Sequence, residues 1–282
     1  MKTTLHNASL DKNSFQAIAD LAYRESGLTL VDEKITMIQS RLRHRLRALE
    51  ISNFTDYCDF VVSENGCDER KQLISALTTN VSHFFRENHH FDALIDHVMT
   101  KLPALKRGDR LRIWSAGCSN GQEALSVAIK LYEAIPNISK LNVRILATDI
   151  DPEVVHFARA GCYSERLMTG VPLDLRAKYF SQKQSKIGEK TYTAQSNVHS
   201  LVQFNELNLL GSWPMRGEFD AIFCRNVVIY FDLKTQTALW PRFRQKLKPD
   251  GVFFLGHSER IADPSNFGFR CSKPTTYTTL ST

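Results

Sequence analysis

The stretch that decides the fold runs from Leu111 to Pro152. Its informative parts are LRIWSAGCSNGQEALSVAIKL at residues 111–131 and VRILATDIDP at residues 143–152. A short apolar run ends in small residues and glycines, a helical pattern follows, and a second apolar run ends in an acid, Asp149. This order of strand, glycine loop, helix, strand and acid is typical of units that hold a nucleoside-bearing ligand at the carboxyl ends of parallel strands.

The residues of this loop indicate which nucleoside-bearing ligand binds. Gly117 and Gly121 allow the backbone to turn tightly and approach a ligand, and Asp149 can accept hydrogen bonds from both ribose hydroxyls. The loop is neither G-x-G-x-x-G nor a P-loop, and Glu123 at the helix start would repel a phosphate but suit an ammonium group. S-adenosylmethionine carries adenosine, a sulfonium and an ammonium, and it has no phosphate. The loop therefore favours this cofactor over a dinucleotide, with a glycine turn in an unrelated α/β protein as the alternative.

Composition excludes several classes of protein. The 282 residues are 43% hydrophobic and 23% charged, which is ordinary globular composition. No apolar run reaches membrane-spanning length and the N-terminus has no signal-peptide pattern, so a cytoplasmic protein without membrane insertion is expected. Cysteines and histidines show no metal-ligand spacing; no metal is predicted, and His89 and His90 are expected on a helix surface. The net charge of +6 is not interleaved with aromatics, so nucleic acid is not predicted as a partner.

Residues 1–78 carry helical periodicity and predict a small all-helical domain. Within residues 35–49 one apolar stripe recurs every three or four positions: Ile35, Ile38, Leu42, Leu46 and Leu49. The opposite face carries four basic side chains: Arg41, Arg43, His44 and Arg47. No acid lies between Lys34 and Arg47, so salt-bridge partners within the helix are absent. A solvated face and a surface for an acidic partner both stay open.

A linker at residues 79–90 leads into a second region, 91–282, in which strands and helices alternate. The pattern predicts strands near 111–115, 143–148, 201–206, 219–224, 251–257 and 276–280, and helices near 121–134, 152–160, 172–180 and 232–247. A turn at Pro249–Gly251 is expected before the strand at 251–257. The fold class is therefore α/β with a mostly parallel, Rossmann-like sheet. Polar residues 183–200 interrupt the alternation and predict a small antiparallel β-subdomain, either structural decoration or a docking surface.

A second chemical segment, FDAIFCRNVVIYF, spans Phe219 to Phe231. Its first six residues predict a buried strand, and Arg225, Asn226 and Tyr230 follow at the carboxyl end. Ligands of open α/β sheets bind at that edge, so these side chains are expected beside the glycine loop and Asp149. A core aromatic with a satisfied hydroxyl is the alternative for Tyr230.

Five segments together resemble the chemotaxis receptor methyltransferases of the CheR type: TTNVSHFFRENHHF, SAGCSNGQEALS, ATDIDPEV, FDAIFCRNVVIYF and LKPDGVFFLGHSE. Their order and spacing fit over essentially the whole chain. The resemblance implies an S-adenosylmethionine-dependent methyltransferase domain after a small all-helical domain. It also implies an enzyme that methylates glutamate side chains on the cytoplasmic helices of chemoreceptors, with S-adenosylhomocysteine as the second product and no metal.

The same resemblance implies roles for individual residues. Arg86 and Tyr230 match the residues at the reacting centre. The residues that match cofactor contacts are Asn80, Ser82, Arg86, Gly117, Glu123, Asp149, Asn208, Leu209, Arg225 and Asn226. The basic helix face (Arg41, Arg43, His44 and Arg47) matches the helix that faces the receptor, and the β-subdomain matches one that in some members grips a receptor C-terminal peptide. A monomer is expected.

Three departures from the family pattern leave these residues intact. Ser82 replaces a common Thr, and Gln122 and Leu125 replace a common Glu and Tyr, which puts only fine cofactor affinity in question. Two alternatives stay open: a methyltransferase acting on another acceptor, and a non-catalytic module that binds S-adenosylmethionine and signals by docking.

Overall fold

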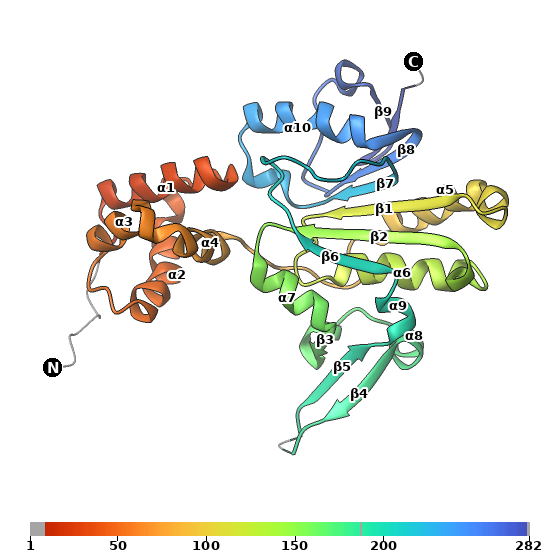
Figure 1. Cartoon of the computed structure of the whole chain (residues 1–282), viewed down its shortest axis with the longest axis horizontal. Coiled ribbons are helices and arrows are strands. Elements are labelled where there is room, and N and C mark those ends of the chain that lie inside the picture. Colours follow the sequence, from red (N-terminus) through yellow and green to blue (C-terminus); the bar gives the residue numbers. More distant parts are fainter. Residues whose placement is uncertain (1–8, 187, 281–282) are drawn as a thin grey trace.

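The computed structural model describes residues 9–186 and 188–280, which form a helical part followed by an α/β part (Figure 1). The helical part contains α1 (Lys12–Ser26), α2 (Ile35–Ala48), α3 (Phe54–Val62) and α4 (Cys67–Leu77). Helix α1 begins after Asp11, whose carboxylate accepts the N–H groups of Asn13 and Ser14, and it ends at Gly27 in the left-handed conformation. Residues 1–8 of the predicted helical domain lie outside the described residues.

Helix α2 confirms the predicted apolar stripe, because Ile38, Leu42 and Leu46 are buried in the core of the helical part. Its basic face is less open than the sequence indicates. The Arg41 guanidinium donates to the carbonyl oxygens of Leu77 (2.9 Å) and Thr78 (3.0 Å) at the end of α4, so it caps that helix instead of facing outward.

Salt-bridge partners for the α2 arginines come from another helix. Arg45 pairs with Glu69 of α4 at 2.6 Å, and the Tyr57 hydroxyl donates to the same carboxylate at 2.9 Å. This agrees with the expectation that α2 offers no salt-bridge partner of its own, and a rule based on neighbours in the sequence does not include a partner on another helix. His44 and Arg47 remain exposed.

The α/β part is built on a sheet with strand order β6-β2-β1-β7-β8-β10-β9. Its strands are β1 (Arg110–Ala116), β2 (Asn142–Asp149), β6 (Val202–Glu206), β7 (Phe219–Cys224), β8 (Leu247–Leu255), β9 (Phe269–Lys273) and β10 (Thr276–Thr279). Its helices are α5 (His89–Lys106), α6 (Gln122–Ala134), α7 (Pro152–Ala160) and α10 (Leu233–Lys246). The strands from β6 to β8 are parallel, and β10 and β9 add antiparallel pairs.

Both faces of the sheet are covered, which explains the continuous apolar strands. Leu111 and Ile113 of β1 join a core with α5 and α6, whereas Trp114 and Ala116 join a second core with α10. In Figure 1, α10 lies on one side of the sheet and α6 and α7 lie on the other. The predicted Rossmann-like α/β class is confirmed, and the four predicted helices are found within about two residues of their expected bounds.

The antiparallel excursion is present but covers a wider range than residues 183–200. It is a three-stranded sheet of order β3-β5-β4, from β3 (Cys162–Ser164), β4 (Phe180–Gln184) and β5 (Lys190–Ala194). Helix α8 (Leu173–Tyr179) precedes β4, and α9 (Ser196–His199) is helical where the prediction extended the β-subdomain. The strand β3 has only three residues, too few to show an alternating pattern.

Three further features differ from the sequence expectations. The segment 249–251 is not a turn before a strand but a bulge inside β8, because Phe219 pairs with Leu247 and Ala221 already pairs with Val252. Strand β9 was not expected. Helix α5 was not expected either, and it begins inside the predicted linker, at His89.

Candidate active site

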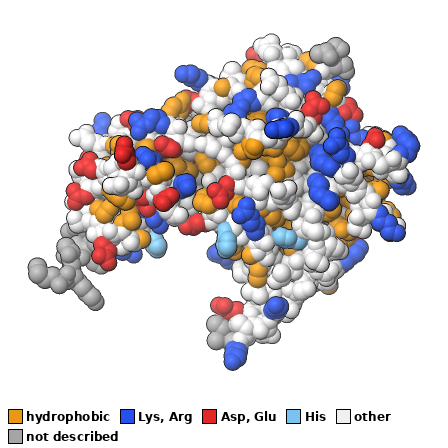
Figure 2. All heavy atoms as spheres, viewed as in Figure 1, with side chains coloured by type: hydrophobic (Ala, Val, Ile, Leu, Met, Phe, Trp, Pro, Cys, Tyr) orange, Lys and Arg blue, Asp and Glu red, His pale blue; other side chains and the backbone are white. Residues whose placement is uncertain are grey.

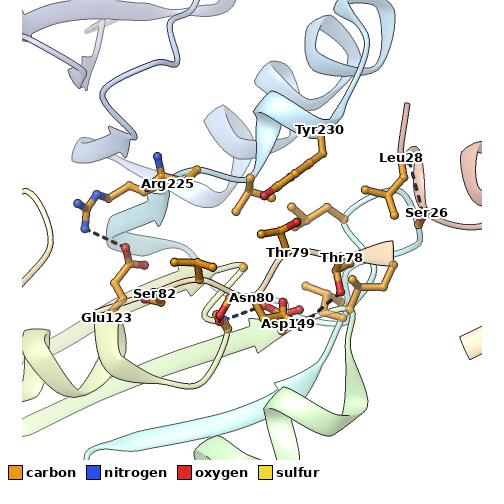
Figure 3. Close-up of a pocket in the computed structure, with 18 of the residues that line it drawn as sticks. Ser26, Leu28, Thr78, Thr79, Asn80, Ser82, Glu123, Asp149, Arg225 and Tyr230 are labelled. Carbon is orange, nitrogen blue, oxygen red and sulfur yellow. Dashed lines mark hydrogen bonds and ion pairs between the residues drawn. The ribbon is translucent and has the colours of Figure 1, made fainter. Parts of the chain in front are cut away.

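A pocket lies at the carboxyl ends of β1, β2 and β7, where the chain order reverses between β1 and β7 (Figure 3). This is the edge at which open α/β sheets bind ligands. All eleven residues that the sequence assigns to the centre and the cofactor line this pocket: Asn80, Ser82, Arg86, Gly117, Glu123, Asp149, Asn208, Leu209, Arg225, Asn226 and Tyr230. The structure therefore brings together segments that lie up to 150 positions apart in the chain.

Asp149 ends β2 and is held by the backbone beneath the pocket. Its carboxylate accepts the N–H of Ser119 at 2.8 Å and that of Asp151 at 3.1 Å. Burial raises its pKa to about 6, although these two N–H groups act in the opposite direction. A carboxylate offers about four acceptor sites, so two remain for donors such as ribose hydroxyls.

The glycine of the loop serves packing more than ligand approach. Gly117 has a φ of +85°, and a Cβ there would lie 2.3 Å from Cγ2 of Val227. Val227 itself lines the pocket. Gly117 therefore lets the segment after β7 sit directly on the glycine loop, which the sequence motif did not indicate.

Glu123 and Arg225 form a buried ion pair. The Arg225 guanidinium donates to Glu123 at 3.0 Å, lies 3.3 Å from Glu87 and is 2% exposed; it also donates to the carbonyl oxygen of Arg86. Figure 3 shows it directed toward Glu123. Ser115 donates to the other oxygen of Glu123 at 2.7 Å. Arg225 thus acts within the protein, where it orients Glu123 and fixes the linker backbone.

Burial acts to raise the pKa of the Glu123 and Glu87 carboxyls, whereas the Arg225 guanidinium acts to lower it. Burial raises the pKa of Glu123, and Arg225 only partly offsets it. For Glu87 burial also acts upward, but Arg225 and the hydrogen bonds from His257 outweigh it and lower the pKa. Glu123 is therefore a poorly solvated carboxyl that would gain from a further cation, such as an ammonium group.

The linker places three predicted residues along the pocket. Asn80 donates to Asp151 at 2.7 Å, which ties the linker to the start of α7. Gln122 of α6 donates to the carbonyl oxygen of Ser82 at 3.4 Å. Arg86 has weaker ties: a 3.3 Å hydrogen bond to the carbonyl oxygen of Val81 and a 3.9 Å ion pair with Glu87, and its side chain is 27% exposed. Its guanidinium therefore keeps donors for an anionic ligand.

Tyr230 reaches the pocket from the 3₁₀ turn Val228–Tyr230 and lies across it from Asp149 (Figure 3). Its carbonyl oxygen accepts the N–H of Thr29 at 2.9 Å. The helical part thus closes one side, and Ser26 and Leu28 line the pocket. The sequence did not indicate these two residues, since nothing in a helix end marks it as a pocket wall.

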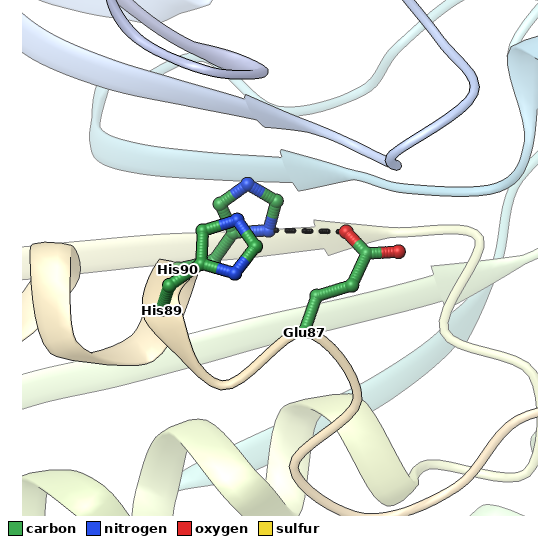
Figure 4. Close-up of side chains that lie close together, drawn as sticks. All are labelled: Glu87, His89 and His90. Carbon is green, nitrogen blue, oxygen red and sulfur yellow. Dashed lines mark ion pairs between the residues drawn. The ribbon is translucent and has the colours of Figure 1, made fainter.

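Glu87, His89 and His90 form a group of three metal-ligand types within the described chain (Figure 4). His90 is fully buried, contrary to the expectation of a surface position, and burial and Arg225 lower its pKa to about 3. The Arg225 guanidinium already supplies the positive charge beside Glu87. A second cation at this place would meet repulsion, so the absence of a metal stays our prediction.

The pocket suits a nucleoside with a cationic tail. Its acids, Asp149 and Glu123, lie on different elements. Between polar side chains the wall also presents apolar ones: Leu28, Ile150, Leu209, Val227 and Phe231. Two arginines line the pocket, and the charge of one of them, Arg225, is neutralised by the carboxylates of Glu87 and Glu123. These features fit S-adenosylmethionine better than a pyrophosphate ligand.

Fold and pocket together define an S-adenosylmethionine-dependent methyltransferase. Comparison with family models narrows the class. Residues 80–278 match the CheR methyltransferase, SAM binding domain, and residues 13–78 match the CheR methyltransferase, all-alpha domain. The chain belongs to the CheR family of chemotaxis protein methyltransferases, as the sequence motifs indicated.

Relatives cover almost the whole chain. It is 42% identical over 258 residues to a probable chemotaxis protein methyltransferase of Rhizobium etli, spanning 91% of this chain and 96% of the relative. It is 38% identical to the chemotaxis protein methyltransferase of Escherichia coli, spanning 90% and 86%, and 36% identical to that of Borreliella burgdorferi, spanning 96% and 95%. A solved structure of PKMT2 from Rickettsia typhi in complex with AdoHcy aligns at 16% identity and a TM-score of 0.33, covering 51% of this chain and 20% of that one.

Proposed function

We propose that this methyltransferase acts on glutamate side chains of chemoreceptor cytoplasmic helices and forms γ-glutamyl methyl esters for sensory adaptation. The observation that carries the proposal is the convergence in one pocket of Arg86 and Tyr230 with the acids Asp149 and Glu123, in a chain of the CheR family. In this proposal the pocket residues keep the roles that the resemblance implies, except that Arg225 acts through Glu123 and Gly117 through its packing against Val227. The domain division at residues 78 and 90 is part of the same proposal.

S-adenosylmethionine supplies a methyl group on a sulfonium sulfur, which a carboxylate oxygen can accept directly, leaving S-adenosylhomocysteine. A glutamate with an ordinary pKa of about 4.3 is ionised at neutral pH, so the chain needs no general base. The anion and the cation lose charge on the way to products, so tight binding of the carboxylate would favour the ground state. Arg86 therefore aims the acceptor rather than holding it strongly. Alignment and exclusion of water supply the main gain, at best roughly 7–11 kcal/mol.

Two surfaces are proposed for the receptor. The helix α2 presents the exposed His44 and Arg47, and the three-stranded sheet is the counterpart of the family's β-subdomain. Figure 2 shows the molecular surface hollowed between the helical part and the three-stranded sheet, and Figure 1 places α2 at one side of this hollow and the three-stranded sheet at the other. Receptor helices would lie against α2, and a receptor C-terminal peptide would pair with the small sheet. No helix of the described residues is long and apolar enough to cross a membrane. The family resemblance supports the further proposal that the protein is recruited to receptors from the cytoplasm, as a monomer.

The deciding experiment is transfer of labelled methyl to membranes that contain chemoreceptors, followed by mild alkali. Base-labile label on the receptor, lost in Arg86→Ala, is the expected result. Transfer to a different acceptor would favour the alternative substrate class, and cofactor binding without transfer would favour a signalling module. Asp220→Asn, a change at the opposite end of β7, is the matched control and should retain transfer.

A further inference from the structure

Glu259 is a buried carboxylate just after β8, 4% exposed and outside the pocket lining. One oxygen accepts the N–H groups of Asn226 at 2.8 Å and Gly256 at 2.6 Å. The other accepts those of Val227 at 2.8 Å and Ile229 at 3.2 Å. Among the described residues no ion pair includes Glu259, so backbone N–H groups alone balance its charge.

Three of these four donors belong to the segment 226–230 that carries pocket residues. Asn226, Val227 and Tyr230 all line the pocket. Asn226 has a φ of +59°, a left-handed conformation that a side-chain-bearing residue adopts at a cost. A Cβ on Gly256 would lie 2.5 Å from Nδ2 of Asn226. The segment is therefore seated tightly in a strained shape, and the carboxylate of Glu259 is what its N–H groups bind.

The carboxylate cannot be replaced by its amide without loss. Each oxygen of Glu259 accepts two N–H groups, and each pair includes at least one donor from the segment 226–230. Whichever way a glutamine turned, its NH₂ group would face two N–H donors. Burial raises the pKa of Glu259, and the four backbone hydrogen bonds act in the opposite direction. The ionised form thus depends on the complete set of donors.

We propose that Glu259 is a positioning residue for methyl transfer: it sets the backbone of residues 226–230 and so aims the Tyr230 hydroxyl at the reacting centre. This inference rests on the proposed function, in which Tyr230 lies near the transferred methyl. Glu259 acts through the backbone and touches neither cofactor nor acceptor.

The first test is Glu259→Gln in the full chain. We expect kcat on receptor membranes to fall about 100-fold while the receptor KM stays within about twofold, because the loss is one of alignment. In the protein without cofactor, the amides of Asn226, Val227 and Ile229 should exchange with solvent at least about tenfold faster. Unchanged exchange at these amides would overturn the proposal whatever the activity.

A double-mutant cycle with Tyr230→Phe separates positioning from general damage. If Glu259 acts by aiming Tyr230, Glu259→Gln should cost far less in the Tyr230→Phe background than in the wild-type chain. Equal losses in the two backgrounds would show that Glu259 does not act through Tyr230. Asp220→Asn, the same acid-to-amide change at a buried position, should show additive behaviour with Tyr230→Phe.

If Glu259→Gln does not fold, Glu259→Asp keeps the charge and shortens the reach. It should give a smaller loss of kcat with the same dependence on Tyr230, and full turnover in this variant would count against the proposal. The wild-type chain in the same assay distinguishes a failure of the positioning role from a failure of the proposed receptor function. Transfer by the wild type and by both Glu259 variants would remove only the positioning role, whereas no transfer by the wild type would remove the receptor function.

Discussion

The two ends of the central sheet treat a buried acid in opposite ways. At the amino end of β7, Asp220 accepts from Lys248 at 2.8 Å and lies 3.5 Å from Lys101, so cations neutralise it. At the carboxyl end of β2, Asp149 accepts only backbone N–H groups, and within the described chain no ion pair includes it. Both acids are at most 8% exposed. Burial alone therefore does not mark a site; a buried acid with free acceptor capacity beside a cavity does.

The largest expected effect sharpens this contrast at the carboxyl end. Arg86→Ala should lower receptor methylation about 100-fold or more, because the acceptor carboxylate loses its alignment, while the cofactor Kd changes less than about threefold. Steady-state transfer of labelled methyl and calorimetric cofactor binding measure the two quantities. A loss confined to cofactor affinity would contradict the aiming role of Arg86.

The next test replaces one buried aspartate by asparagine at each end of the central sheet. Asp149→Asn should weaken cofactor binding by roughly 10- to 100-fold, since hydrogen bonds to a charged acceptor contribute about 1.5–3 kcal/mol. Asp220→Asn should leave cofactor binding unchanged and instead lower the free energy of unfolding by about 1–3 kcal/mol, because Lys248 loses its charged partner and Lys101 keeps only Asp250. Calorimetry measures the cofactor affinity of both variants, and urea unfolding measures their free energy of unfolding. Similar effects of the two substitutions on affinity would break the comparison.

The pH dependence of stability and of cofactor affinity should reveal Asp149 at the carboxyl end of the sheet. Because burial raises the pKa of Asp149 to about 6, from an ordinary value of 3.8, the folded state binds the extra proton between these values. Asp149 therefore lowers stability progressively as the pH rises from about 4 to 6, and its cost is complete above that range. Ribose hydroxyls need the ionised form, so cofactor affinity should fall up to about tenfold between pH 7 and pH 5. The profile of Asp149→Asn should lack this component; superimposable profiles would refute it.

The smallest effect concerns the helical part, away from both sheet ends. Arg47→Glu on α2 should raise the receptor KM about two- to fivefold at low salt and leave kcat unchanged, with the difference vanishing at high salt. Lys12→Glu makes the same charge change on α1 and serves as the control. An unchanged KM for Arg47→Glu at low salt would remove α2 as the receptor surface.

Local sequence patterns predicted many of the helices and strands. Apolar periodicity located α6, α7, α8 and α10 of the α/β part and all but one of the strands of its large sheet, because side-chain period depends on neighbours in the chain. It missed the long helix α5. The same patterns failed for the short strand β3, which has three residues, and for the bulge in β8, which depends on pairing with β7. The limit lies where structure depends on partners far along the chain.

The sequence by itself determined the sheet class and the end of the sheet that binds ligand, since parallel strands bring their carboxyl ends to one edge. That topology also indicated Asp149, Arg225 and Asn226, whereas the linker residues and Asn208 with Leu209 followed from the family resemblance. Only the tertiary structure decided what each polar group does. Arg225 turns inward to Glu123 and Glu87, Arg41 caps α4, and Glu259 collects N–H groups from about thirty positions earlier in the chain. Hydrogen-bond partners of this kind are set by which segments fold side by side, and no local pattern encodes them.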